Sequence, residues 1–297
     1  MRVTERMIFD SAQSQIAAAR DQMQKMQQQV ASGERVVAPG DDPGAAGLMV
    51  SYQIAIQRHD AIDQTASRAS DETQVADGAL QNVSTLLQQA KDLAVQLGND
   101  TYSASERAAG AQEITSISNQ IVAQMNTQVA GRYIFGGNVD RTAPFDPSGN
   151  YAGDTAVRQV EVAPGVLQDS SIRADQALKG VGGGVDAFAS LSTLATALAS
   201  NDAATIRSSV GDLTTADDQV AQALTQAGGI MDALQSAQTI GGLAKDTTQK
   251  LLSGVADADM FDATSQLALA QQSLQATLDV SARGFSISLL SYMPAPA

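Results

Sequence analysis

The stretch ASGERVVAPGDDPGAAGLMV, residues 31–50, separates two long runs of helical sequence and therefore decides the fold. It places four glycines, two prolines and the doublet Asp41-Asp42 within twenty residues. Glycine and proline at this density end a helix, because glycine is too flexible and proline lacks the backbone donor. The composition alone suits a ligand loop, a metal loop or a joint between two rods, and the flanking sequence must decide.

The flanking runs carry apolar or small residues at alternating spacings of three and four. The run before the joint has Phe9, Ala12, Ile16, Ala19, Met23, Met26 and Val30. After the joint the same alternation continues from Leu48 to Leu97. This spacing is typical of a coiled-coil seam. At about 1.5 Å per residue the second helix is about 75 Å long, so the joint lies between two rods.

The long helix is expected to end at GNDT, residues 98–101. Ser103 followed by Glu106 predicts a capping box at the start of another helix, which continues to about Ala130. A short link between two long helices makes them antiparallel neighbours.

The pattern then changes to short β-prone segments separated by Gly, Pro, Asn and Asp: GRYIFGG (131–137), APFD (143–146) and VRQVEVAPG (157–165). They predict a small β-rich insert from 131 to about 180. The stretch GVGGG (180–184) is read as a flexible boundary, because it lacks the Gly-Lys-Ser/Thr ending of a phosphate loop. Helical spacing returns at about Ala187, and Gly228-Gly229 is read as a close-packing point inside a continuing helix.

The predicted fold is mainly α: a long antiparallel helical bundle or coiled coil from both chain ends, with a small β-rich insert in the middle. Four parts follow from this layout. Residues 1–32 and 258–297 form a terminal coiled-coil domain, and 33–44 with 253–257 form a two-stranded joint. Residues 45–130 and 203–252 form a long-helix bundle, and 131–202 form the β-rich hairpin and outer insert.

The two terminal helices are expected to pack on each other, because a lone amphipathic helix cannot bury its apolar stripe. Two paired helices still expose apolar surface, which favours assembly with neighbouring molecules. The residues predicted to pack between them are Ile16, Met23, Met26, Val30, Leu267, Leu274, Leu278 and Phe285.

Composition argues against an enzyme and against several partners. The net charge of −14, with 18 basic and 32 acidic residues and no basic cluster, disfavours nucleic acid and anionic membranes. The chain has no Cys and one His, His59, so thiolate and Cys/His metal sites are excluded. The Asp-rich segments lack calcium-loop spacing. We therefore expect no catalytic residues, no cofactor and no metal.

No secretory signal and no membrane span are expected. The N-terminus lacks a basic stretch followed by an apolar core, and no run approaches the roughly 18 apolar residues of a span. The chain is expected to be cytosolic or exported by a route that reads no cleaved signal.

The opening stretch resembles the signature of the flagellin superfamily, in which a first helix ends in Ser-Gly-x-Arg before a short loop, Asp-Asp and a helix start of small residues. Here the matching residues are Ser32, Gly33, Arg35, Asp41, Asp42, Ala45, Ala46 and Gly47. AVQLGNDTYSASER (94–107) is similar to the family's break between two long helices, and residues 257–293 resemble its C-terminal helix. Pro43 after Asp-Asp and the GRYIFGG motif look like the hook–filament junction group rather than filament flagellins. The Gly228-Gly229 region lacks an Arg often found in that group, and the insert is short.

The resemblance implies a secreted structural subunit, exported through the flagellar export apparatus and polymerised as a homo-oligomeric ring in the extracellular flagellum. The first hook-associated protein would lie below it and flagellin above it. A cytosolic export chaperone would hold the C-terminal helix before secretion. Residues Gly33, Arg35, Asp41, Asp42 and Pro43 would form the joint, with the acidic pair bonding to Arg35 of the same subunit or to an Arg of a neighbour.

Two other functions remain open on the sequence. A short filament flagellin would have the same rods and a different set of partners, and the GRYIFGG motif separates it from a junction protein. A soluble helical adaptor or export-chaperone-type binding protein belongs to another class. Such an adaptor need not keep its two chain ends complementary.

Overall fold

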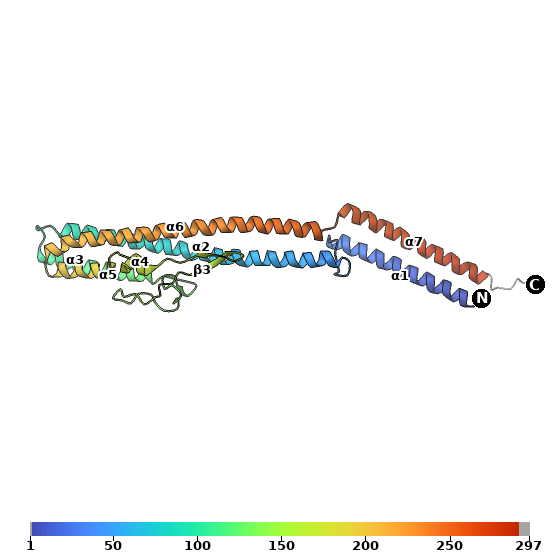
Figure 1. The fold of residues 1–297 in the computed structure, drawn as a ribbon, viewed down its shortest axis with the longest axis horizontal. Helices are drawn as coiled ribbons and strands as arrows, with labels where there is room; N and C mark the ends of the chain where they lie inside the picture. The colour runs from blue at the N-terminus through green and yellow to red at the C-terminus, as the bar shows by residue number, and fades with distance from the viewer. Residues whose placement is uncertain (1, 291–297) are drawn as a thin grey trace, which may run out of the picture. The chain divides into compact units, whose positions relative to one another are not determined.

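The computed structural model describes residues 2–290, with the side chains of 6, 7 and 9–283. This part of the chain forms seven helices and two small antiparallel sheets, which confirms the predicted fold class (Figure 1). The helices are α1 (Arg2–Ser32), α2 (Pro43–Leu97), α3 (Ala104–Met125), α4 (Ala174–Lys179), α5 (Ala187–Ala199), α6 (Ala203–Ala256) and α7 (Met260–Leu290). The strands are β1 (Gln128–Val129), β2 (Arg132–Tyr133), β3 (Gln159–Ala163) and β4 (Val166–Asp169).

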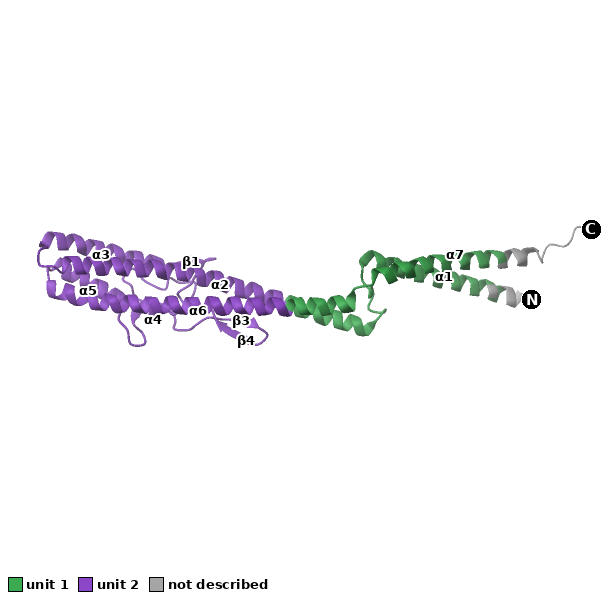
Figure 2. Cartoon of the chain, turned by 90° about the horizontal axis from the view of Figure 1, so that it is seen from above, with its two compact units in different colours: residues 1–57, 245–297 green, residues 58–244 purple. Residues whose placement is uncertain are grey.

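The chain divides into two compact units, shown in different colours in Figure 2. The terminal unit comprises residues 1–57 and 245–297, and the middle unit comprises residues 58–244. The long helices α2 and α6 each supply residues to both units. The predicted division into four parts stays a prediction. Helix α6 continues to Ala256, so most of the segment predicted as the second joint strand, 253–257, is helical.

In the terminal unit, α1 and α7 lie side by side and antiparallel (Figure 1). The most buried positions of α7 are Ala263 and Ala270, with Leu267 and Leu274 partly buried between and after them. Their spacing of four and three keeps one stripe of α7 toward its partner helix. Alanine at alternate positions lets two helices approach closely.

In the middle unit, α2, α3, α5 and α6 share one hydrophobic core with the β-rich insert. Aliphatic side chains fill it at helical spacing, including Leu80, Leu87, Ile114, Ile121 and Leu213, all without exposed surface. Gly228 and Gly229 lie within α6, which continues through them without a break. The predicted close packing there is wrong, because no neighbouring element lies within 4 Å of the place that a Cβ would occupy at either glycine.

A polar position in this core has a local explanation. Asp217 occurs where the seam of α6 would otherwise be apolar. Its carboxylate accepts hydrogen bonds from Ser84 Oγ at 2.6 Å and Gln88 Nε2 at 3.2 Å, both on α2. The Asp217 carboxylate is partly buried, and these two hydrogen bonds hold α6 against α2.

A buried arginine holds the turn from α2 to α3. Arg107, almost fully buried, donates to the carbonyls of Leu97 and Asn99 at the end of α2 and to Asn201 Oδ1 beyond α5. Carbonyls at a helix C-terminus lack intrahelical donors, and a guanidinium supplies several at once. Ser103 and Glu106 form the predicted capping box at the start of α3.

Helix α3 ends at Met125, before the predicted end at about Ala130. The side chain of Asn126 pairs with the backbone of Phe145 through two hydrogen bonds, 2.8 and 3.0 Å long. This pairing turns the chain out of the helix and into β1. The segment 174–179, expected to belong to the β-rich insert, forms the short helix α4, which ends at Gly180 with φ +68°.

Candidate functional site

The joint in the terminal unit is a short two-stranded crossing between the end of α1 and the start of α7. Gly33 ends α1 with φ +74° and donates its backbone N–H to Gln29 O, a geometry that favours glycine. Arg35 N donates to Ala256 O at 2.6 Å, and Ala258 N donates to Gly33 O at 2.8 Å. These bonds pair Glu34 with Asp257 as an antiparallel bridge.

Arg35 connects two helix ends within the same subunit. Its guanidinium donates to Val255 O near the C-terminus of α6 and to Asp42 Oδ2 just before α2, both at 3.1 Å. The free carbonyls at a helix end attract a cation, and a carboxylate pairs with it by charge. Gln29 Nε2 donates to Arg35 O at 2.7 Å and so fixes the backbone of the same residue.

Asp41 and Asp42 serve different ends of the loop. Asp41 accepts from Lys25 Nζ at 2.8 Å and from Ala38 N at 3.0 Å, and these two bonds, led by the one from Lys25, hold the pKa of its carboxyl below 3.8. Asp42 caps α2 by accepting from Ala45 N at 3.0 Å, and this bond, with Arg35, lowers its pKa likewise. Pro43 is the first residue of α2, where its missing N–H is not needed.

The residues predicted for terminal-helix packing lie at different depths. Ile16, Met23, Val30, Leu267 and Leu274 are partly buried and Met26 is buried. Leu278 remains 40% exposed, and the side chain of Phe285 lies outside those described.

Several contacts at this site gave no signal in the sequence reasoning. Lys25 lies about two turns before the end of α1 and carries no local sequence signal, because its pairing with Asp41 depends on the loop geometry. The Ala263–Ala270 stripe carried a usable signal, because Ala263, Leu267, Ala270 and Leu274 repeat the spacing of four and three. A search that favours large apolar residues passes over alanine.

Large apolar side chains remain on the surface of the terminal unit. Phe261 is 84% exposed and Val280 is 70% exposed on α7, and Phe9, Ile54 and Leu251 are exposed on α1, α2 and α6. Exposed apolar side chains of this size are typical of a surface that binds another protein, and the middle unit also has some, including Val95, Leu167 and Ile240.

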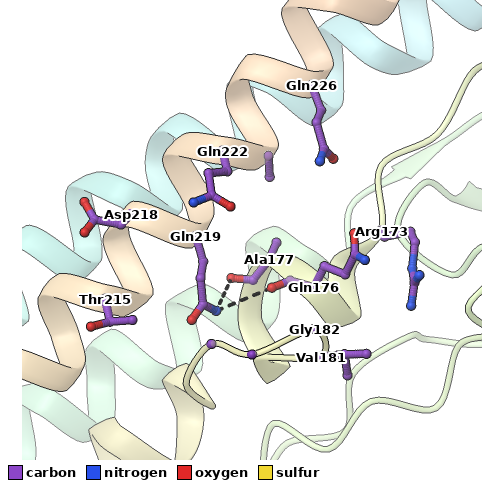
Figure 3. A pocket seen from close by; sticks show the side chains of 13 residues that line it. Arg173, Gln176, Ala177, Val181, Gly182, Thr215, Asp218, Gln219, Gln222 and Gln226 are labelled. Atoms are coloured by element: carbon purple, nitrogen blue, oxygen red, sulfur yellow. Dashed lines mark hydrogen bonds between the residues drawn. The ribbon is translucent and has the colours of Figure 1, made fainter.

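The glycine-rich segment 180–184 forms a loop beside α6, next to a cavity of about 530 Å³ (Figure 3). Gln219 holds the loop, because its amide accepts from Val185 N at 2.6 Å and donates to Val185 O at 3.1 Å. It also reaches the carbonyls of Gln176 and Ala177, as the dashed lines show. The N–H groups of Gly183 and Gly184 are bonded to Gly180 O and do not point at a ligand.

The described residues offer little for catalysis. His59 is partly buried beside an apolar cavity lined by Ile62, Val162 and Ile240. No group of three or more His, Asp or Glu in the described part of the chain is arranged to hold a metal ion. Among the same residues, no helix has the length and apolar character of a membrane span.

Comparisons with known proteins find similarity to flagellar proteins. Residues 3–140 match the model of the bacterial flagellin N-terminal helical region. Flagellar hook-associated protein 3 of Salmonella typhimurium is 31% identical over 162 residues, which cover 54% of this chain and 51% of that protein. The chain thus spans about half the length of the curated relatives that it matches.

Solved structures share the fold at lower identity. A putative flagellar hook-associated protein from Vibrio parahaemolyticus matches 73% of this chain and all of its own, with a TM-score of 0.68 and 22% identity. The flagellar junction protein FlgL from Legionella pneumophila matches 62% of this chain and 99% of its own, with a TM-score of 0.52 and 14% identity.

Residues 3–140 are similar to the N-terminal helical region of bacterial flagellins, and the chain is built from long helices at both ends of the sequence around a small β-rich insert. The fold is shared with solved structures of hook-associated protein 3, also called FlgL, and the resemblance seen in the sequence is confirmed. The matched proteins are named as flagellar proteins and not as enzymes.

Proposed function

We propose that the chain is a structural subunit of the bacterial flagellum that joins the hook-associated proteins to the flagellin filament. The observation that carries the proposal is the paired terminal helices with their two-stranded joint, in a chain that shares the fold of hook-associated protein 3. The exposed apolar residues of the terminal unit supply surface for contacts with neighbouring subunits.

The finer features of this proposal follow the family resemblance. Copies of the chain would form a ring outside the cell, after export through the flagellar apparatus, with the first hook-associated protein on one side and flagellin on the other. An export chaperone would bind the C-terminal helix before secretion. The domain division and the roles of the joint residues belong to the same proposal.

Deletion of the gene tests the function directly. Cells without the protein are expected to build hooks, to lack filaments and to release flagellin into the medium. Complementation with the wild-type gene should restore filaments. Normal filaments in the deletion strain, with flagellin retained, would contradict the junction role.

A second candidate is a short filament flagellin, favoured by the match of residues 3–140 to a flagellin model. The two functions differ in abundance and place. Gold-labelled antibody should mark a band at the hook–filament boundary if the chain is a junction subunit. Labelling along the whole filament would favour the flagellin.

Point variants test the role of the terminal helix. Leu274→Glu and Leu278→Glu introduce a charge on or beside the stripe that α7 turns toward α1, and they are expected to block incorporation into the flagellum while the middle unit stays folded. Gln275→Glu is the matched control, because Gln275 is an exposed neighbour on the same helix. Normal assembly of both leucine variants would count against terminal pairing.

A further inference from the structure

The middle unit contains a cavity with an unusual charge for this protein. It has a volume of about 450 Å³ and lies between α2 and the β-rich insert. Arg68, Arg132 and Arg158 line it, with Glu72 as the acidic residue of the lining. The whole chain carries a net charge of −14, so a local excess of positive charge runs against its composition.

Two of the three arginines are held in place by carboxylates. Arg158 Nη2 lies 3.0 Å from Glu72 Oε2, and its side chain is only 12% exposed. Arg132 Nε donates to Asp140 Oδ2 at 2.6 Å, while half of the Arg132 side chain stays exposed. Each ion pair uses one edge of the guanidinium, and a guanidinium carries five N–H donors in a planar fork.

Donors of the exposed Arg68 and Arg132 side chains remain available to a ligand, whereas Arg158 is largely buried. Within the described part of the chain, the buried Nε of Arg158 has no hydrogen-bond partner. Arg68 is exposed, and its one hydrogen bond among these residues runs from Nε to Gln64 O in its own helix. A buried donor without an acceptor is unfavourable, so an acceptor entering this region would be stabilised.

A purely structural role does not explain why three arginines line this cavity. Arg158 joins the insert to α2 through Glu72, but the hydrogen bond of Arg68 stays within its own helix, so closure of the fold does not account for all three arginines. The neighbouring cavity around His59 is lined mainly by apolar residues and has no such charge.

We propose that the pocket formed by Arg68, Arg132 and Arg158 binds an oxyanion of the carboxylate or phosphate class. Planar forks of N–H donors match the paired oxygens of these groups, and Arg suits them better than Lys for that reason. The oxyanion can come from a free inorganic ion or from acidic side chains of a protein segment. The binding does not depend on the proposed function.

The test titrates the full-length, ¹⁵N-labelled protein at constant ionic strength. One arm uses inorganic phosphate and the other uses a short peptide of Asp and Glu with blocked ends. We expect saturable shifts of the arginine Nε–H signals and of the backbone amides of 65–72 and 157–160. A tighter response to the peptide identifies a protein carboxylate as the ligand, and a response to phosphate alone identifies a small inorganic oxyanion.

Variants separate a site from general screening of charge. Arg68→Gln should weaken binding roughly tenfold, as loss of charge-assisted hydrogen bonds implies, and Arg68→Glu should abolish it. Arg20→Gln is the matched control, because Arg20 is exposed on α1 in the other unit. Circular dichroism of each variant checks the fold.

Two results would overturn the proposal. The first is the absence of saturable shifts in both arms. The second is equal weakening by Arg68→Gln and Arg20→Gln, which would show that the anion only screens the surface.

Discussion

The terminal and middle units have the same spacing of apolar residues along their helices, but the side chains at these positions are buried to different depths. In the middle unit four helices and an insert enclose aliphatic side chains, and Leu87, Ile114 and Leu213 have no exposed surface. In the terminal unit the most buried positions of α7 are alanines, and large apolar residues stay exposed. Two helices can cover one stripe of each other, whereas a bundle can enclose a core. The middle unit is therefore expected to supply most of the stability, and the terminal unit to supply the surface for the proposed assembly.

The largest expected difference between the units is in resistance to proteolysis. In an isolated monomer, a non-specific protease should remove residues of about 1–40 and 255–297 roughly ten times faster than it cuts the middle unit, because local opening precedes cleavage. Mass spectrometry of timed samples gives the boundaries. If the two chain ends resist the protease in a sample that light scattering shows to be monomeric, the terminal unit is not less stable than the middle unit.

A cavity in the core should have the largest effect on stability among single substitutions. Leu87→Ala removes a side chain without exposed surface and is expected to lower the free energy of unfolding by about 3–5 kcal/mol. Leu269→Ala is the control in α7, where the side chain is exposed, and it should change the value by less than about 0.5 kcal/mol. Urea unfolding followed by circular dichroism measures both, and similar losses would contradict the difference in depth.

Loss of the arginine that closes the middle unit should have a smaller effect. Arg107→Met keeps much of the buried stem and leaves the carbonyls of Leu97 and Asn99 without their donor. The expected loss of unfolding free energy is about 1–3 kcal/mol, since water can reach part of the turn. Arg207→Met is the control, because Arg207 bonds to Gly98 O in the same turn from an exposed position. If Arg107→Met is as stable as Arg207→Met, the hydrogen bonds of Arg107 are not needed to hold the turn between α2 and α3.

Much of the helical layout could be predicted from the sequence, because repeated spacing and caps are local signals. The break at 98–101 and the Ser103–Glu106 capping box depend on neighbours within one turn, and both are present in the structure. The end of α3 was not predictable in this way. It depends on the pairing of Asn126 with Phe145, which is nineteen residues away.

The position of the joint in the sequence could be predicted, but the hydrogen bonds and ion pairs within it could not. Gly33 and Pro43 mark where helices end and begin, since their backbone properties are intrinsic. The partners of Arg35 come from residues brought together by folding, and one of them is a backbone carbonyl, Val255 O, that no side-chain pattern reports. Within the described subunit the structure places Arg35 on Asp42, one of the two alternatives left open by the sequence.

The smallest expected effect concerns the charges of the joint and is a test of pH. Hydrogen bonds from Lys25 to Asp41 and from Ala45 to Asp42 lower the pKa of both carboxyls below 3.8, so their stabilising contribution is complete above about pH 4. It is lost as the pH falls through the lowered folded pKa values. The double variant Asp41→Asn/Asp42→Asn should unfold at a lower temperature than the wild type at pH 7, and the difference should shrink as the pH falls below 4.

The control separates the joint from the general charge of the chain. Asp10→Asn/Asp21→Asn removes the same charge from exposed positions of α1. Asn at position 42 can still cap α2, since its side-chain oxygen accepts from Ala45 N, but it no longer offers a carboxylate to Arg35. A pH-dependent difference confined to the joint variant therefore reports the Lys25 and Arg35 contacts. An equal difference in unfolding temperature for the control would assign the effect to the net charge of the protein. The joint would then be stabilised by its backbone hydrogen bonds alone.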